Sequence, residues 1–201
     1  VAYACHPDAW GVQIVFDNQV ILGTRARKTR TKSFNAFSSI DYPETAMFRD
    51  RRLIQFLQRP AEYTHAVFST ALDPNVFVLR LVPGMRADII PLLEGRYRAL
   101  VLESFGVGGL PGGDDGAMFA AVRDWCGAGH LAVFTTQVPH EGSDLAVYEV
   151  GRAAKALPGV LEAHDMTPEA TAVKLMWVLG QTTDRAEAEK LFLTPVQWDI
   201  L

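Results

Sequence analysis

The stretch ALVLESFGVGGLPGG, residues 99–113, indicates the fold class of this chain. Its first part is a short run of Leu, Val and Ala, which is typical of a strand buried on both faces of a parallel sheet. Its second part holds five glycines within residues 103–113. Because open α/β sheets bind ligands beyond the carboxyl ends of their strands, this loop is a candidate ligand-facing turn. It matches neither the GxGxxG nor the GxxxxGK[ST] pattern, so a plain strand-to-helix turn stays open as an alternative.

The same alternation of strand-like and helix-like segments continues on both sides of this stretch. Further strands are predicted at Val76–Leu81, Leu131–Thr135 and, more briefly, Leu161–Ala163. Helices are predicted over residues 87–93, 116–126, 146–156, 168–179 and 186–192. Thr167 is suited to cap the helix that begins at Pro168, since proline is tolerated in a first helical turn. This order predicts a three-layer α/β domain with a parallel sheet over residues 76–201.

The region before residue 76 has a weaker pattern. Apolar runs at Trp10–Phe16 and Val20–Gly23 flank the turn residues Asp17-Asn18-Gln19, which predicts an antiparallel hairpin. An isolated hairpin is marginal in water, so we expect its remaining sheet partners to lie elsewhere. Residues 1–45 are therefore interpreted as the remnant of a larger unit. Residues 46–75, which carry Pro and Asn breakers, are interpreted as a linker with short helical or strand pieces.

Composition limits the classes of partner. The chain has 201 residues, 49% of them hydrophobic, with a formal net charge of -4. It is long enough to bury a core, and its acidic balance predicts no nucleic-acid partner. No apolar run reaches the roughly 18 residues that cross a bilayer, so no membrane partner is expected. Cys5 and Cys126 belong to no metal-ligand pattern, which predicts a reduced cytoplasmic setting with no metal and no cofactor.

One basic stretch, Arg25–Lys32, departs from the acidic average. It lacks the interleaved aromatic residues of a typical single-stranded nucleic-acid site. A nucleic-acid patch and a solvated loop are both open interpretations of the charges alone.

Polar side chains concentrate in Thr135–Asp144, which leaves the next predicted strand at the same sheet edge. This loop combines hydroxyls, an amide, an imidazole and two carboxylates, and we expect a binding surface there. A catalytic relay of Ser143, His140 and Asp144 is disfavoured, because neighbours on one loop rarely reach relay geometry and no GxSxG elbow occurs.

Three segments in combination resemble the carboxy-terminal portion of bacterial type I L-asparaginases: residues 99–113, TTQVPHEGSDLAVYEVG at 135–151, and EAHDMTPEATAVKLMWVLGQTTD at 162–184. The resemblance implies an asparaginase-like α/β fold and hydrolysis of asparagine to aspartate and ammonia. It also implies that the amino-terminal nucleophile domain is not in this sequence, except for a hairpin remnant in residues 1–45. On this interpretation the chain alone is expected to be inactive.

The resemblance also implies roles for individual residues. Arg25-Ala-Arg-Lys28, followed by Phe34–Ser39, matches the segment in which the family carries a catalytic lysine, and Lys28 takes that position. The family's catalytic threonines and aspartate have no counterpart among these 201 residues. For substrate binding, the resemblance points to Gly109, Glu141, Ser143 and Asp144, although Gly109 stands where many relatives have asparagine.

The implied partners are L-asparagine or L-aspartate and further copies of the chain, as a homodimer or homotetramer. Two other functions stay open. The chain is suited to act as a non-catalytic dimerisation or amino-acid-binding module. It is also compatible with a related amidohydrolase of tRNA-dependent amide transfer, although the acidic composition disfavours tRNA binding.

Overall fold

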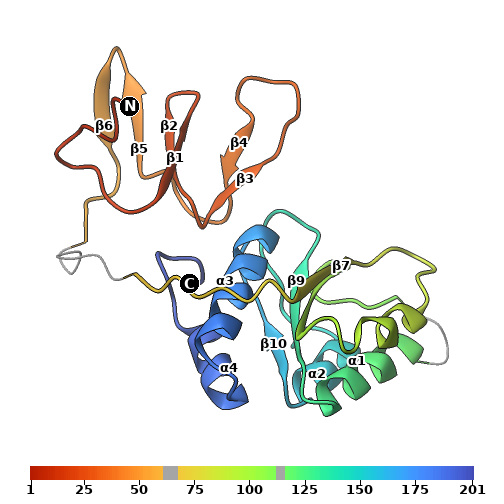
Figure 1. The fold of residues 1–201 in the computed structure, drawn as a ribbon. Coiled ribbons are helices and arrows are strands. Elements are labelled where there is room, and N and C mark those ends of the chain that lie inside the picture. Colours follow the sequence, from red (N-terminus) through yellow and green to blue (C-terminus); the bar gives the residue numbers. More distant parts are fainter. Residues whose placement is uncertain (61–67, 112–115) are drawn as a thin grey trace.

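A computed structural model describes residues 1–60, 68–111 and 116–201 (Figure 1). Part of the linker expected at 46–75 and the end of the glycine-rich loop lie outside these ranges. A β-rich unit is formed by residues 1–60, and an α/β unit follows from residue 68. The carboxy terminus lies on the side of the α/β unit that faces the β-rich unit (Figure 1).

The α/β unit is built on a sheet of four parallel strands in the order β10-β9-β8-β7. The strands are β7 (Val76–Arg80), β8 (Ala99–Ser104), β9 (Leu131–Thr136) and β10 (Val160–Glu162). All four predicted strands are confirmed. Their carboxyl ends share one edge of the sheet, as parallel pairing requires.

Helices follow the predicted order. They are α1 (Ala117–Gly127), α2 (Glu149–Lys155), α3 (Pro168–Gln181) and α4 (Arg185–Leu193). Thr167 caps α3, because its side chain accepts a hydrogen bond from the amide of Ala170. The helix predicted at 87–93 is instead two 3-10 turns, η1 (Ala87–Ile89) and η2 (Pro91–Leu93). Pro91 has no amide hydrogen to donate, which prevents one continuous helix there.

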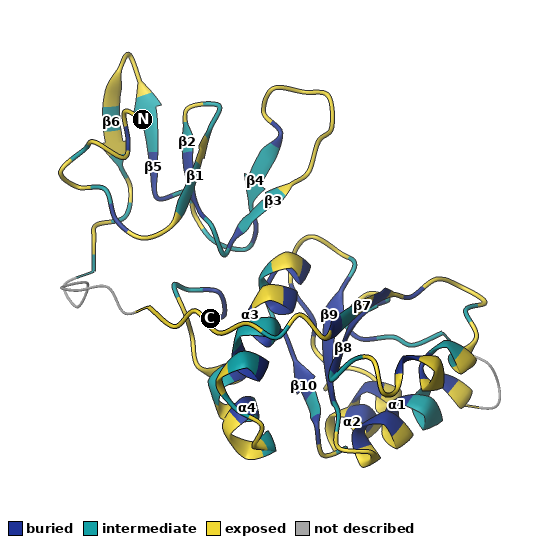
Figure 2. Ribbon diagram, viewed as in Figure 1, coloured by how far each residue is buried: buried dark blue, intermediate teal, exposed yellow. Residues whose placement is uncertain are grey.

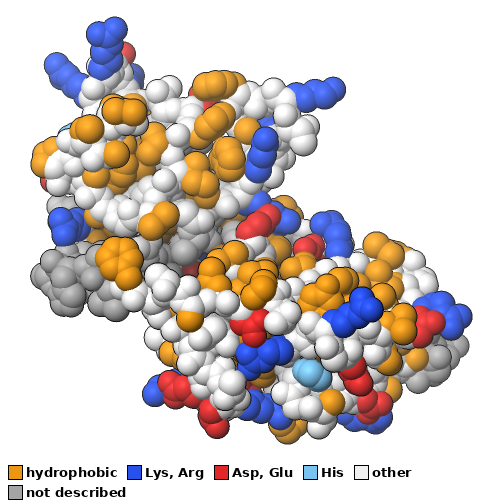
Figure 3. Space-filling view, in the orientation of Figure 1, with side chains coloured by type: hydrophobic (Ala, Val, Ile, Leu, Met, Phe, Trp, Pro, Cys, Tyr) orange, Lys and Arg blue, Asp and Glu red, His pale blue; other side chains and the backbone are white. Residues whose placement is uncertain are grey.

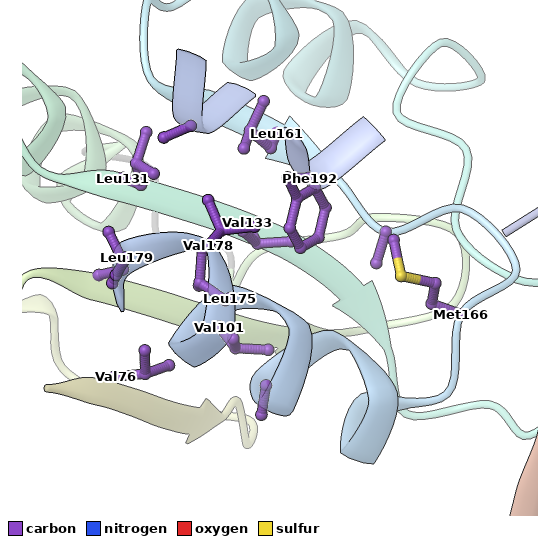
Figure 4. Packing of buried hydrophobic residues seen from close by; sticks show 14 of the residues in the cluster. Val76, Val101, Leu131, Val133, Leu161, Met166, Leu175, Val178, Leu179 and Phe192 are labelled. Atoms are coloured by element: carbon purple, nitrogen blue, oxygen red, sulfur yellow. The ribbon is translucent and has the colours of Figure 1, made fainter. Parts of the chain in front are cut away.

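The core of this unit forms two layers, one on each face of the sheet. On one face, Val101 and Val133 pack with Leu175 and Val178 of α3 and with Phe192 of α4 (Figure 4). On the other face, alternate residues of the same strands meet α1 and the 3-10 turns: Leu100, Leu102, Ala132 and Phe134. The continuous apolar runs therefore cover both faces of the sheet. The unit is a three-layer α/β fold.

The β-rich unit contains an antiparallel sheet of order β1-β2-β5-β6. Its strands are β1 (Gln13–Phe16), β2 (Gln19–Leu22), β5 (Ala46–Arg49) and β6 (Arg52–Gln55). The predicted hairpin is confirmed, but its sheet partners lie within this chain. They come from residues 46–55, in the range expected to be a linker. Asp50 and Arg51 both have positive φ and form the turn between β5 and β6, although the pair is not a typical turn sequence.

A second hairpin joins β3 (Ala26–Lys28) to β4 (Phe37–Ser39) beside this sheet. Figure 2 shows a thick buried interior in the α/β unit and a more exposed β-rich unit, whose core cluster is centred on Tyr3, Val20 and Ala46. Hydrophobic side chains also lie at the surface of the β-rich unit (Figure 3). They include Val12, Val15, Phe34, Ile54 and Phe56. Within the described ranges no helix is long and apolar enough to span a membrane.

Candidate functional site

Side-chain hydrogen bonds hold two loops at the carboxyl edge of the parallel sheet. At the end of β8, Ser104 Oγ donates to the carbonyl of Thr135 at 2.7 Å. At the end of β9, Thr136 Oγ1 donates to the carbonyl of Gly106 at 2.5 Å. Gln137 Nε2 donates to the carbonyl of Glu103 at 2.8 Å. Each loop is thus fixed to the neighbouring strand, and both begin at the same edge.

The glycine-rich loop and the 135–144 loop are in direct contact. Phe105 and Gly109 exchange two backbone hydrogen bonds of 2.9 and 2.7 Å, which close the glycine loop into a tight turn. The amide of Asp144 donates to the carbonyl of Val107 at 2.8 Å. A Cβ at Gly108, where φ is +150°, would lie 2.6 Å from Leu145 Cδ2. The structure therefore brings Gly109 and Asp144 into one region, and the φ of Gly108 favours glycine where the loops meet.

The segment 141–144 separates two exposed carboxylates from one buried hydroxyl. Glu141 and Asp144 are exposed, and Asp144 Oδ1 accepts a hydrogen bond from the amide of Ala146 at 2.8 Å. Ser143 is buried, with its amide 2.8 Å and its Oγ 3.4 Å from the carbonyl of His164. Glu141 and Asp144 are consequently the groups available to a ligand, whereas Ser143 anchors the loop.

No Ser–His–Asp relay forms in this loop. His140 Nδ1 lies 3.2 Å from Asp41 Oδ1, which belongs to the β-rich unit. The Oγ of Ser143 is directed to a carbonyl. The contacts agree with the expectation that neighbouring residues on one loop do not give relay geometry.

Glu162, at the end of β10, supports the loop and was not singled out by sequence. It is 4% exposed, and its Oε1 accepts a hydrogen bond from the amide of Leu145 at 2.6 Å. Its Oε2 lies 3.0 Å from Lys155 Nζ and 3.9 Å from His164 Nδ1. A buried carboxylate needs such partners, so Glu162 connects the loop to α2 and β10.

Lys28 lies at the end of β3, paired with Phe37 of β4. Its side chain is exposed and makes no hydrogen bond or ion pair within the part of the chain that the structure describes. No such contact joins it to Gly109, Glu141, Ser143 or Asp144 among these residues. The four predicted binding residues are in two touching loops, and Lys28 belongs to the other unit.

Three residues before Lys28, Arg25 is fully buried, which contradicts the solvated-loop interpretation at this position. Its Nη2 lies 2.8 Å from Asp165 Oδ2, and Nη1 donates to the carbonyl of Asp165 at 2.9 Å. Nε donates to the carbonyl of Trp198 at 2.5 Å. The guanidinium also lies 5.5 Å from the centre of the Tyr42 ring. Burial raises the pKa of Tyr42, and the charge of Arg25 opposes that rise.

Local sequence held no signal for this contact, because Asp165 and Trp198 lie 140 and 173 residues from Arg25. As for metals, no group of three or more His, Cys, Asp or Glu side chains suited to an ion occurs in residues 1–60, 68–111 and 116–201.

Two family models match this chain. The model described as "Glutaminase/Asparaginase C-terminal domain" matches residues 75–192, more than half of the chain. The model described as "Asparaginase, N-terminal" matches residues 1–62, so that match extends beyond residue 45 into the strands β5 and β6.

Curated relatives have two different names. L-asparaginase of Thermococcus kodakarensis is 38% identical over 182 residues, covering 90% of this chain and 54% of the relative. A glutamyl-tRNA(Gln) amidotransferase subunit of Metallosphaera sedula is 33% identical over 178 residues, covering 86% of this chain and 39% of the relative. The chain thus spans about half, or less, of the length of these relatives.

Solved structures agree with the family matches. The thermostable L-asparaginase from Thermococcus kodakarensis superposes with a TM-score of 0.88 at 35% identity, covering 95% of this chain and 57% of that structure. L-asparaginase I from Vibrio cholerae shares the fold with a TM-score of 0.78 at 23% identity, covering 94% of this chain and 57% of that structure. The α/β fold is that of these asparaginase structures. The chain belongs to the glutaminase/asparaginase family.

Proposed function

We propose that this chain serves in the hydrolysis of L-asparagine to L-aspartate and ammonia. The observation that carries the proposal is the exposed Lys28, which has no partner among the described residues and lies within the match to the asparaginase amino-terminal model. The 38% identity to a protein named L-asparaginase supports the choice of substrate.

In the proposed mechanism Lys28 assists the nucleophile. A lysine side chain either holds a hydroxyl in place as the ammonium or, as the neutral amine, takes up the hydroxyl proton as a base. The nucleophile itself is not assigned to any residue of 1–201. Glu141 and Asp144 are suited to attract the α-ammonium group of the substrate, and the tight turn at Gly109, whose amide and carbonyl are paired with Phe105, holds the adjoining loop in place. The buried Ser143 is assigned to holding this loop rather than to contacting substrate.

The experiment that tests the proposal measures ammonia release from L-asparagine and L-glutamine. It uses residues 1–201 and a fusion in which the unmatched amino-terminal part of Thermococcus kodakarensis L-asparaginase precedes Val1. We expect release by the fusion and little or none by residues 1–201 alone. In the fusion, Lys28→Met is expected to lower kcat by roughly a hundredfold or more, while the exposed control Lys32→Met leaves it unchanged. Near-normal turnover of Lys28→Met would remove the assignment of Lys28.

A second candidate function is a place in tRNA-dependent amide transfer, favoured by the 33% identity to a component of a glutamyl-tRNA(Gln) amidotransferase. The two candidates differ in the amide they release and in their need for tRNA. A fusion that uses L-glutamine in preference to L-asparagine, with release that rises when charged tRNA is added, would favour the second candidate.

A non-catalytic dimerisation or amino-acid-binding module remains the third alternative. Calorimetry of residues 1–201 with asparagine, aspartate and glutamine separates ligand binding from a purely structural role, because only binding gives saturable heat. The proposed assembly is a homodimer or homotetramer, to be measured by sedimentation velocity. The proposed setting is the cytoplasm, which the two free cysteines support.

A further inference from the structure

We propose that Arg25 is a positioning residue that fixes the strand carrying Lys28 relative to the Gly142–Asp144 loop. The inference rests on the proposed function, which assigns Lys28 to catalysis and the Gly142–Asp144 loop to the substrate site. The contacts of Arg25 themselves do not depend on catalysis. The Arg25–Asp165 contact joins the strand that carries Lys28 to the turn under the loop that carries Asp144.

The backbone of Arg25 transmits its position directly to the Lys28 hairpin. The amide of Arg25 donates to the carbonyl of Leu22 at 3.0 Å, and the carbonyl of Arg25 accepts from the amide of Ile40 at 2.9 Å. Arg25 is thus bound both to the end of β2 and to the residue that follows β4. Lys28, at the end of β3, lies three residues after Arg25, so the position of the Arg25 backbone is linked to that of the hairpin.

On the other side, the partners of Arg25 support the substrate loop. Asp165 directly follows His164, which has a φ of +51° and whose carbonyl accepts the amide of Ser143 at 2.8 Å. A Cβ at Gly142 would lie 2.5 Å from the carbonyl oxygen of His164 and 2.9 Å from Asp165 Cα. The loop therefore packs directly on the 164–165 turn. A continuous series of contacts runs from Lys28 through Arg25, Asp165 and His164 to the loop.

Arginine suits this role better than lysine. Its three nitrogens reach Asp165 Oδ2, the Asp165 carbonyl and the Trp198 carbonyl in one planar group, whereas an ammonium is a point charge. Asp165 is fixed in turn, since its Oδ1 accepts the amide of Leu201 at 3.1 Å.

Among the described residues, two other pairs of ionisable side chains join the units but are more exposed. Arg27 Nε lies 3.4 Å from Glu169, whose side chain is 60% exposed, and His140, 61% exposed, lies 3.2 Å from Asp41. Exposed pairs contribute little, so among these pairs Arg25–Asp165 is the principal one, and it acts beside uncharged contacts such as the 2.8 Å hydrogen bond from Thr24 Oγ1 to the carbonyl of Gln197.

The first test measures the distance between the β3–β4 hairpin and the segment that follows the Gly142–Asp144 loop. It uses double electron–electron resonance on residues 1–201. Spin labels are placed at Lys32→Cys and Val147→Cys in a Cys5→Ser background, and the buried Cys126 does not compete for label. We expect one narrow distance distribution in the reference chain and one at least about twice as broad in Arg25→Gln. The matched control is Arg30→Gln, whose side chain donates to the carbonyl of Asn35 in the same β3–β4 hairpin, and it should leave the distribution narrow.

An unchanged narrow distribution in Arg25→Gln would overturn the proposal. If Arg25→Gln does not fold, as judged by circular dichroism, Arg25→Lys and Asp165→Asn carry the same test. Each keeps part of the contact, and both are expected to broaden the distribution.

The second test measures kinetics in the fusion described above. Arg25→Gln is expected to lower kcat by at least about tenfold with little change in KM, because Lys28 is displaced while Glu141 and Asp144 remain in place. Asp165→Asn should match it, and the double variant should be no worse than either single one. Additive losses, or an unchanged kcat, would overturn the proposal. If the fusion releases no ammonia at all, the proposed hydrolysis fails, and the distance measurement alone decides the role of Arg25.

Discussion

At the residue scale, the pair Lys174–Asp199 shows how this fold tolerates buried charge. The two side chains are 5% and 3% exposed, and Nζ lies 2.8 Å from Oδ2 and 2.8 Å from the carbonyl of Thr194. Burial lowers the pKa of Lys174, and Asp199 opposes that shift. Asp199→Ala should therefore destabilise the chain by about 3–5 kcal/mol, since it leaves a desolvated ammonium. Urea unfolding measures this loss.

The control for this prediction is Glu189→Gln, which breaks the half-buried Arg185–Glu189 pair and should cost less than about 1 kcal/mol. The double variant Lys174→Met/Asp199→Ala should lose less than the sum of its single variants, because it leaves no unpaired charge. Equal losses for Asp199→Ala and Glu189→Gln would contradict this account.

Cys126 gives a second prediction at the residue scale. Burial raises the pKa of its thiol to about 11 from 9.0, with the charge of Arg185 and the amide of Ala132 acting in the opposite direction. The folded chain therefore keeps this proton more tightly than the unfolded chain. The resulting stabilisation is complete below pH 9 and is lost as the pH rises through about 11. Stability measured against pH should fall less over this interval in Cys126→Ala than in the parent.

Thiol labelling checks the same burial. At neutral pH a thiol reagent should modify the exposed Cys5 quickly. Cys126 should react only as fast as the chain opens, because the thiolate is the reactive form and burial both shields the Cys126 thiol and keeps it protonated. Labelling of both cysteines at one rate in native buffer would contradict the buried position of Cys126.

At the element scale, the loop of the candidate site depends on Gly142. Its φ is +67°, and a Cβ there would lie 2.5 Å from the carbonyl oxygen of His164. Gly84 is the matched control, with a φ of +79° and nothing within 4 Å of the added atom. Gly84→Ala should cost about 1 kcal/mol from backbone strain alone. Gly142→Ala should cost roughly 2 kcal/mol more, from overpacking. Chemical denaturation measures the loss of unfolding free energy in each variant. Equal losses in the two variants would mean that the 164–165 turn moves to accommodate the added Cβ, and they would contradict the prediction.

The elements that sequence predicted correctly have strong local signals. The strands β8 and β9 are continuous apolar runs, and α3 begins with Thr167 and Pro168, a cap and a first-turn residue. The strands β3 to β6 have three or four residues each, and all but β4 include a charged residue. Their pairing depends on distant partners, such as Ala46 with Val20, and local periodicity carries no information on such pairs.

At the scale of the whole molecule, sequence predicted that the two candidate loops leave the same sheet edge but not how the two units meet. The parallel order places residues 103–111 and 135–144 together, and the hydrogen bond from the amide of Asp144 to the carbonyl of Val107 joins them. The contact of Arg25 with Asp165 spans 140 residues. A basic stretch has the same local pattern whether its first arginine is solvated or buried, so only the folded arrangement distinguishes the two.

The net charge of the chain gives the last prediction. A charge of -4 and an isoelectric point near 5.7 provide no broad positive field, and the most basic stretch has Arg25 buried and Arg27 paired with Glu169. Residues 1–201 should therefore not bind tRNA at physiological salt, as measured by fluorescence anisotropy of labelled tRNA. Binding through phosphate contacts would weaken by roughly 10³–10⁵ between 50 and 200 mM salt if 6–10 phosphates were neutralised. Detection of such salt-sensitive binding would favour tRNA-dependent amide transfer over asparagine hydrolysis, because only the former requires the nucleic acid.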